Sequence, residues 1–226
     1  MPNKIFMKIA RRTLVLTAGL FLTVSAFGYF FWYKPKFKSP SKADAFAFTP
    51  KEAAGTKETL LRLDKKAIEA KDYITGHGFD EKRCFLLDMQ VASGKNRFFV
   101  YNLEEDFVEM AGLVAHGSGI ANNSNTPVFS NTPNSYCTSL GKYKIGKSYH
   151  GQFGLAYKLY GLDKTNCNAF DRFVVLHGHE CVPNSEIDPL PICESWGCPT
   201  VSPAFLAQLK SYIDSSSKPI LLWIYY

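Results

Sequence analysis

The chain has 226 residues, of which 46% are hydrophobic, and a formal net charge of +6; this is enough for one domain with a core and an appendage. Residues 1–42 hold eight of the 26 Lys and Arg side chains and no acidic residue, so residues 43–226 carry 18 basic and 20 acidic groups, a net charge of −2. This near neutrality excludes the broad basic face of a nucleic-acid-binding domain.

An uncharged run covers residues 13–33 and ends in five aromatic residues. Its 21 residues are enough to span a bilayer as a helix, and aromatic side chains favour the interface. The four basic residues before it predict that residues 1–12 form a cytoplasmic tail and that 13–33 form a signal anchor. A cleaved signal peptide is the alternative, with residues 24–26 as a small-residue cleavage site. Both readings predict an exported, periplasmic or extracytoplasmic domain, and the signal anchor would make the inner membrane a partner.

Residues 34–48 are rich in Lys, Pro, Ser and Ala, which is typical of a linker. Next, Thr49, Pro50 and Glu52 have the pattern of a helix start, with Thr49 as the cap. The apolar spacing predicts an amphipathic helix that continues from there to Gly76.

From Arg83 onward the pattern changes to short apolar runs between polar turns, which predict strands. The expected strands are 84–90, 97–103, 107–115, 141–145, 156–160, 172–176 and 220–226. A helix is expected from Ser202 to about Ile213. Residues 49–226 are therefore expected to form one β-dominated α+β domain, a mixed sandwich or barrel with a few peripheral helices.

The segment ESWGCPT, residues 194–200, places Cys198 between a glycine and a proline. These neighbours predict a sharp turn that exposes the thiol. A cysteine of this kind is either a small buried hydrophobe, half of a disulfide or a nucleophile. The loop AHGSG, residues 115–119, is a weaker candidate for a functional loop at the end of a strand.

His177 and Gly178 follow a buried strand and are expected to form a corner 21 residues before Cys198. An imidazole near a thiol is the usual means of forming a thiolate at neutral pH. A backbone carbonyl at the corner is able to orient the ring, and Gly197 leaves amide N–H groups free for a developing oxyanion. These two segments together predict a cysteine–histidine site.

The pattern HG at 177–178 followed by SWGCP at 195–199 resembles the L,D-transpeptidase catalytic domain of bacterial cell-wall enzymes. The resemblance extends in order over residues 60–226. Its further matching positions are Leu87, Asp88, Arg97, Val114–Gly117, Ser118, Gly119, Phe129–Asn131, Ser139–Gly141, Gly161, Leu162, Asn168, Ala169 and Arg172.

The resemblance implies a β-rich fold, peptidoglycan stem peptides as the substrate and no cofactor or metal. It assigns Cys198 as the nucleophile that expels a terminal D-alanine, and His177 as its base. The implied positioning and binding groups are the Gly178 carbonyl, the Gly197 and Cys198 amides, Ser195 and Trp196 at the rim, and His116, Ser139 and Arg172. An acceptor amine would then form a cross-link, whereas water would give L,D-carboxypeptidase activity.

Four positions depart from the family pattern. Trp196 stands where better-known relatives have a second histidine, and Glu194 stands where an arginine is expected. His179 and Cys181 replace a small and an aromatic residue. The charge change at Glu194 is expected to weaken the binding of an anionic stem peptide.

Two alternatives use the same residues. A zinc-binding exported protein would use His177, His179, Cys181 and Cys198, with Cys193 nearby, because these ligand types have spacings that suit zinc. A non-catalytic wall-binding module would keep the cleft and lack turnover.

In an oxidising compartment, paired cysteines tend to form disulfides and isolated cysteines tend to stay buried, and we expect this of the other cysteines. Cys181 and Cys193 bound a proline-rich stretch with little core of its own, so we expect a disulfide between them that holds this loop over the site. Cys198 is expected to stay reduced, and Cys84, Cys137 and Cys167 are expected to be mostly buried.

Overall fold

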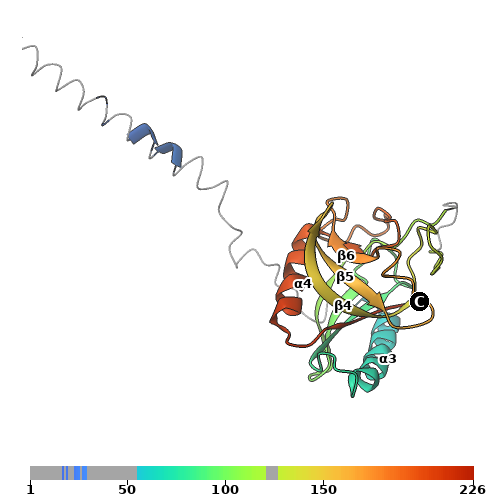
Figure 1. The fold of residues 1–226 in the computed structure, drawn as a ribbon. Helices are drawn as coiled ribbons and strands as arrows, with labels where there is room; N and C mark the ends of the chain where they lie inside the picture. Colours follow the sequence, from blue (N-terminus) through green and yellow to red (C-terminus); the bar gives the residue numbers. More distant parts are fainter. Residues whose placement is uncertain (1–16, 18, 20–22, 26, 30–54, 121–126) are drawn as a thin grey trace, which may run out of the picture. The chain divides into compact units, whose positions relative to one another are not determined.

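The computed structural model describes residues 17, 19, 23–25, 27–29, 55–120 and 127–226 (Figure 1). It divides into two units, Met1–Ala47 and Phe48–Tyr226. The described residues of the first unit are helical and exposed. None of the helices among the described residues has both the length and the apolar character needed to cross a membrane. Most of the anchor expected at 13–33, the tail 1–12 and the linker 34–48 lie outside the described residues.

In the second unit, the first described helix is α3, Lys57–Ile74. Thr56 caps it, accepting a hydrogen bond from the Thr59 amide, and Gly55 before it has a left-handed φ of +75° that a continuous helix cannot contain. The helix therefore starts later than the sequence predicted, and the expected cap at residues 49–52 lies outside the described residues. The face that α3 buries consists of Thr59, Leu63, Ala67, Ala70 and Ile74.

Eight strands form one mixed sheet in the order β3-β2-β1-β8-β4-β5-β6-β7. Their bounds are β1 Arg83–Asp88, β2 Phe98–Asn102, β3 Phe107–Gly112, β4 Gly141–Gly151, β5 Gly154–Gly161, β6 Val175–Gly178, β7 Thr200–Val201 and β8 Leu221–Tyr225. Parallel pairing occurs only for β1 with β8 and for β6 with β7 among these strands. The expectation of a β-dominated mixed fold with few helices is confirmed.

The sheet has apolar residues on both faces because each face is covered by a helix (Figure 1). One core contains α3 with Leu86, Phe99 and Leu221 of the sheet. The other contains helix α4, Pro203–Ser215, with Phe85 and Leu222, the strand neighbours that point to the opposite face. The central strands are thereby fixed in register, because a slip by one residue would exchange the two apolar sets.

β4 extends to Gly151, beyond the predicted end at residue 145, and the start of β6 also differs from the prediction. Residues 172–174 were expected in this strand, but Phe173 has a φ of +57° in a turn closed by its amide on the Phe170 carbonyl. The strand starts at Val175 and includes His177 and Gly178, which were expected in a corner after it. The expected corner is therefore wrong, and His177 lies on a hydrogen-bonded strand.

β7 was not predicted, because two residues carry no alternating pattern. Thr200 and Val201 pair with His177 and Gly178 of β6. Ser202 then caps α4 by accepting a hydrogen bond from the Phe205 amide. The chain thus passes from Cys198 into the sheet and onto the core helix within five residues.

A disulfide joins Cys181 and Cys193. The loop that it closes has its own small apolar cluster, in which Val182 and Ile192 pack with Leu113 and Ala115. Of the other cysteines, Cys84 and Cys137 are buried, but Cys167 is exposed, so the expectation of burial is wrong for Cys167.

Replacing both Cys181 and Cys193 by Ser is expected to lower the free energy of unfolding by about 3 kcal/mol, because a loop of this size gains entropy in the unfolded chain. Urea unfolding of the full chain without reductant measures this, with Cys167→Ser as the control. Equal midpoints for the double variant and the control would contradict a stabilising disulfide.

Candidate active site

His177 is the central side chain of the site and is only 5% exposed. Its Nδ1 lies 3.1 Å from the Gly178 carbonyl oxygen, and its Nε2 lies 3.0 Å from Thr200 Oγ1. A carbonyl oxygen only accepts, so Nδ1 carries the proton and Nε2 of the neutral ring holds the lone pair. The ring is thereby held in the tautomer that exposes a basic nitrogen at Nε2.

Phe153 covers the ring from the hairpin between β4 and β5. Its ring stacks on His177 with 4.8 Å between centroids and 21° between planes, and it meets His179 edge-on. Burial lowers the pKa of His177, and the nearby His179 lowers it further, while the hydrogen bond to Gly178 opposes both effects. The imidazole is therefore neutral at physiological pH.

Cys198 lies on the turn before β7 and is half-buried. Its Sγ accepts a hydrogen bond from the Val175 amide at 3.5 Å and donates to the Phe173 carbonyl at 3.8 Å. Burial raises the pKa of the thiol, and the Val175 amide and the charge of Arg172 counteract this. Because burial raises the pKa of the thiol and lowers that of the imidazole, the resting site contains a neutral thiol and a neutral imidazole.

Thiol and imidazole come from neighbouring segments. The amide that contacts Sγ belongs to Val175, two residues before His177 on β6. Val175 and His177 are two residues apart on β6, so their side chains point to the same face of the sheet. None of the hydrogen bonds among the described residues joins Sγ to the imidazole, since each group has another partner in this state.

The turn that carries Cys198 is fixed by Ser195. Its hydroxyl donates to the Cys198 carbonyl at 2.6 Å and accepts from the Gly197 amide at 3.1 Å. The expectation of two free amides is therefore wrong for Gly197; among the described residues the Cys198 amide makes no hydrogen bond. Gly197 has a φ of +108°, and a Cβ there would lie 2.7 Å from the Cys137 carbonyl oxygen, so only glycine fits.

His116 lies beneath the same turn. Its Nδ1 accepts from Arg97 Nη2 at 2.9 Å, and its Nε2 lies 3.8 Å from Glu194 Oε1. Burial and the Arg97 charge lower the pKa of His116 to about 4, so this ring is neutral. Its carbonyl accepts the Ser195 amide at 2.8 Å. The structure therefore places His116 as a support for the turn that carries Cys198.

Arg172 and Ser139 were both expected to bind substrate. Ser139 is 1% exposed, and its hydroxyl contacts Tyr143 at 2.7 Å, so it has no surface to offer a substrate. Arg172 uses its guanidinium to hold the loop before β4, donating to the Ser130 and Cys137 carbonyls. Its positive charge acts on Cys198 by lowering the thiol pKa.

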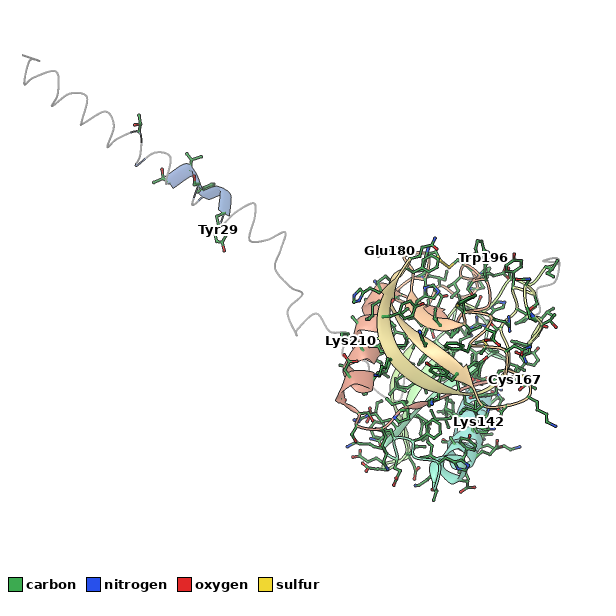
Figure 2. All side chains as sticks on the ribbon, viewed as in Figure 1. Tyr29, Lys142, Cys167, Glu180, Trp196 and Lys210 are labelled. Carbon is green, nitrogen blue, oxygen red and sulfur yellow. A yellow bond between two sulfur atoms is a disulfide. The ribbon has the colours of Figure 1, made fainter. Side chains whose placement is uncertain are left out.

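Trp196, labelled in Figure 2, is 79% exposed, and its ring packs on that of Tyr136 with 5.8 Å between centroids. Phe173, whose carbonyl contacts the thiol, is exposed as well. Tyr136 and Phe173 both have positive φ values, which are uncommon for bulky residues and cluster at functional sites. Exposed aromatic side chains therefore occur at Phe173, whose carbonyl contacts the thiol, and at Trp196, two residues before Cys198.

The zinc alternative does not fit this arrangement. Cys181 is bonded to Cys193, and a disulfide sulfur is not the thiolate that zinc requires. Among the described residues no three His, Cys, Asp or Glu side chains are placed to hold a metal ion.

Sequence reasoning missed Thr200, Phe153, Phe173 and Tyr136. Thr200 becomes relevant only through the register of β6 with β7, which no local pattern reveals. Phe153 was detectable in principle, since an aromatic residue at the tip of the hairpin turn GQFG has no core to enter.

Comparison with known proteins gives a family match. The family model described as the L,D-transpeptidase catalytic domain matches residues 56–225. None of the curated proteins that were compared matches the chain.

Three solved structures are similar to the chain at low identity. The Ldtfm–avibactam carbamoyl enzyme is 12% identical, with 65% of this chain and 50% of that chain covered and a TM-score of 0.40. The helical cell shape determining protein Pgp2 from Campylobacter jejuni is 10% identical, covers 71% and 54%, and has a TM-score of 0.41. The L,D-transpeptidase from Xylanimonas cellulosilytica is 15% identical, covers 63% and 60%, and has a TM-score of 0.36. The chain thus spans only about half to three fifths of the length of these proteins.

Removing the charge of Arg172 is expected to make Cys198 less reactive at neutral pH. In Arg172→Met the thiolate loses a nearby positive charge, so the thiol pKa rises and alkylation of Cys198 by iodoacetamide shifts to higher pH. Arg172→Lys keeps the charge and serves as the matched variant, with melting curves recorded for both. A pH profile for Arg172→Met that equals that of the unsubstituted protein would contradict this electrostatic role.

Proposed function

Because the chain belongs to the L,D-transpeptidase catalytic-domain family, we propose that it performs cysteine-dependent acyl transfer on peptidoglycan stem peptides. The observation that carries the proposal is the pair of segments around β6. One contains a half-buried thiol on a glycine turn, and the other contains an imidazole whose Nδ1 proton is fixed by the Gly178 carbonyl. These are the parts that thiolate acyl transfer requires.

In the first half-reaction the thiol proton passes to His177 Nε2, and the sulfur keeps the electron pair. The thiolate attacks the carbonyl carbon before the terminal D-alanine of a stem tetrapeptide. The C–N bond then breaks, Nε2 returns the proton to the leaving D-alanine amine, and the acyl group remains on Cys198 as a thioester. The Gly178 carbonyl holds the ring and supports the positive charge that it carries during this step.

The oxyanion formed by this attack needs donors close to Sγ. The Cys198 amide supports this role, because it has no partner among the described hydrogen bonds and lies on the nucleophile itself. The Gly197 amide is bonded to Ser195 and would have to leave that bond to contribute.

In the second half-reaction an amine attacks the thioester, Nε2 takes its proton and the thiol is restored. An amine from another stem peptide gives a cross-link, and water gives a trimmed tripeptide. Trp196 and Glu194 are at the rim where the acceptor arrives, so the aromatic and acidic departures from the family pattern are the positions to examine for acceptor choice.

We further propose that residues 49–226 work outside the cytoplasm as a catalytic domain. The uncharged run 13–33 after a basic tail supports an anchor in the inner membrane, and the composition of 34–48 supports a linker. The membrane is in this view a partner through the anchor alone.

Cys198→Ala is expected to abolish release of D-alanine from tetrapeptide muropeptides, because the reacting atom is absent. The full-length chain is incubated with the muropeptides, and products and acyl-enzyme are followed by mass spectrometry. Cys167→Ala is the matched control, an exposed cysteine that Figure 2 shows well apart from Trp196. If the unsubstituted chain binds muropeptides but releases no product, the proposal of an enzyme is wrong and the chain is a wall-binding module.

His177→Ala is expected to reduce D-alanine release by about 10²–10⁴-fold, the usual contribution of a general base. It is also expected to move alkylation of Cys198 to higher pH, since the thiol then ionises without a proton acceptor. His150→Ala, on the exposed part of β4, is the control. An alkylation profile unaffected by His177→Ala would rule out this imidazole as the partner of the thiol.

A further inference from the structure

Thr200 lies between the imidazole and the peptide of the nucleophile. Its Oγ1 is 3.0 Å from His177 Nε2 and 3.3 Å from the Cys198 carbonyl oxygen. The residue is 3% exposed, and the parallel pairing of β7 with β6 sets Thr200 directly opposite His177. One buried hydroxyl therefore contacts both the imidazole and the backbone carbonyl of Cys198.

The donor and acceptor roles follow from the fixed partners. Because the Gly178 carbonyl requires the proton on Nδ1, Nε2 of the neutral ring only accepts, and Thr200 must donate to it. The Cys198 carbonyl also only accepts, and the hydroxyl has one proton. The hydroxyl therefore has two orientations, one in which its proton points to Nε2 and one in which it points to the Cys198 carbonyl oxygen.

We propose that Thr200 is a positioning residue for His177, whose hydroxyl turns between these two orientations as the ring gains and loses a proton. The proposal rests on the proposed function only in that Cys198 gives its proton to His177. With a neutral ring, Thr200 donates to Nε2. With a protonated ring, Nε2–H donates to Thr200 Oγ1, and the hydroxyl proton turns to the Cys198 carbonyl.

The step is balanced within the site. The S–H bond of Cys198 breaks, its electron pair stays on sulfur, and an N–H bond forms at Nε2. The O–H bond of Thr200 remains intact and only rotates. The carbonyl is able to accept this proton beside that of Ser195, since an oxygen has two lone pairs.

The hydroxyl favours the charged ring more than the neutral ring. A hydrogen bond from an imidazolium is charge-assisted and about twice as strong as a neutral one. The surroundings offer little else, since Phe153 stacks on one face and none of the ion pairs among the described residues includes His177. The titratable and charged groups that face the pair are His179 near the ring, and Arg172 and Tyr143 near the thiol. A protonated His179 would oppose the imidazolium, so Thr200 and Gly178 are the groups that stabilise it.

The test is the pH profile of Cys198 alkylation by iodoacetamide in the full-length protein, which needs no wall substrate. Thr200→Val keeps the shape and removes the hydroxyl, so the profile is expected to move up by about one pH unit, with about tenfold slower alkylation at neutral pH. Thr200→Ser keeps the hydroxyl and is expected to keep the profile. Thr132→Val, an exposed threonine, is the matched control.

An unchanged profile for Thr200→Val with an unchanged melting temperature would overturn the proposal, because packing alone would then explain the residue. A shift to lower pH would overturn it as well, since the hydroxyl would then withhold Nε2 from the thiol. Failure of the unsubstituted chain to release D-alanine, with the expected alkylation profiles, would reject the proposed function and leave the role of Thr200 standing.

A second measurement does not depend on any variant folding. The ring ¹⁵N chemical shifts of His177 in the unsubstituted protein report which nitrogen carries the proton. A proton on Nδ1 alone at neutral pH is expected. A proton on Nε2 in the neutral ring would overturn the proposal, because Thr200 would then have no role as a donor.

Discussion

The pairing of β6 with the two-residue strand β7 is the constraint on which the site depends. It is the last pair of an eight-stranded sheet, and it contains both His177 and the residue two positions after Cys198. The parallel register puts Thr200 of β7 opposite His177 of β6. On β6, the Val175 amide contacts the thiol. Backbone pairing thereby brings two segments that are 21 residues apart along the chain into neighbouring positions.

The electrostatics of this pair favour an uncharged resting state. Burial raises the pKa of Cys198 and lowers that of His177, so both shifts oppose the thiolate–imidazolium pair. Two dipoles and one charge oppose these pKa shifts. The Gly178 carbonyl acts at the ring, and the Val175 amide and the charge of Arg172 act at the sulfur. Preorganised dipoles of this kind stabilise charge at the moment it forms and need no reorganisation. A thiol kept protonated at rest is also less open to oxidation, which would matter in the oxidising compartment that we propose for this domain.

The sequence was sufficient for the fold class, for most strands and for expecting Cys198 and His177 on neighbouring segments, because these depend on local pattern and on short motifs. It was insufficient where long-range contacts determine the strand bounds, the burial of polar side chains or the register of the sheet. Phe173 has the apolar character of a strand residue, yet a turn with positive φ takes it out of β6. Ser139 and Arg172 matched the family pattern, but whether a polar side chain faces substrate or supports a loop depends on burial in the finished fold. The register that makes Thr200 a partner of His177 exists only once the sheet is assembled.

The disulfide complements this pairing from outside the sheet. Cys181 follows the end of β6 by three residues, and Cys193 precedes Cys198 by five, so the bond links the same two segments that β6 and β7 bring together. Between them the chain has few contacts with either main core, and its own cluster is small. Without the covalent link, motion of this loop would act directly on the strand end with the imidazole and on the turn with the thiol. Acyl transfer loses efficiency with displacements of about 1 Å, so a loop with a weak core beside the site needs a constraint from both sides. The sheet supplies the inner constraint and the disulfide supplies the outer one.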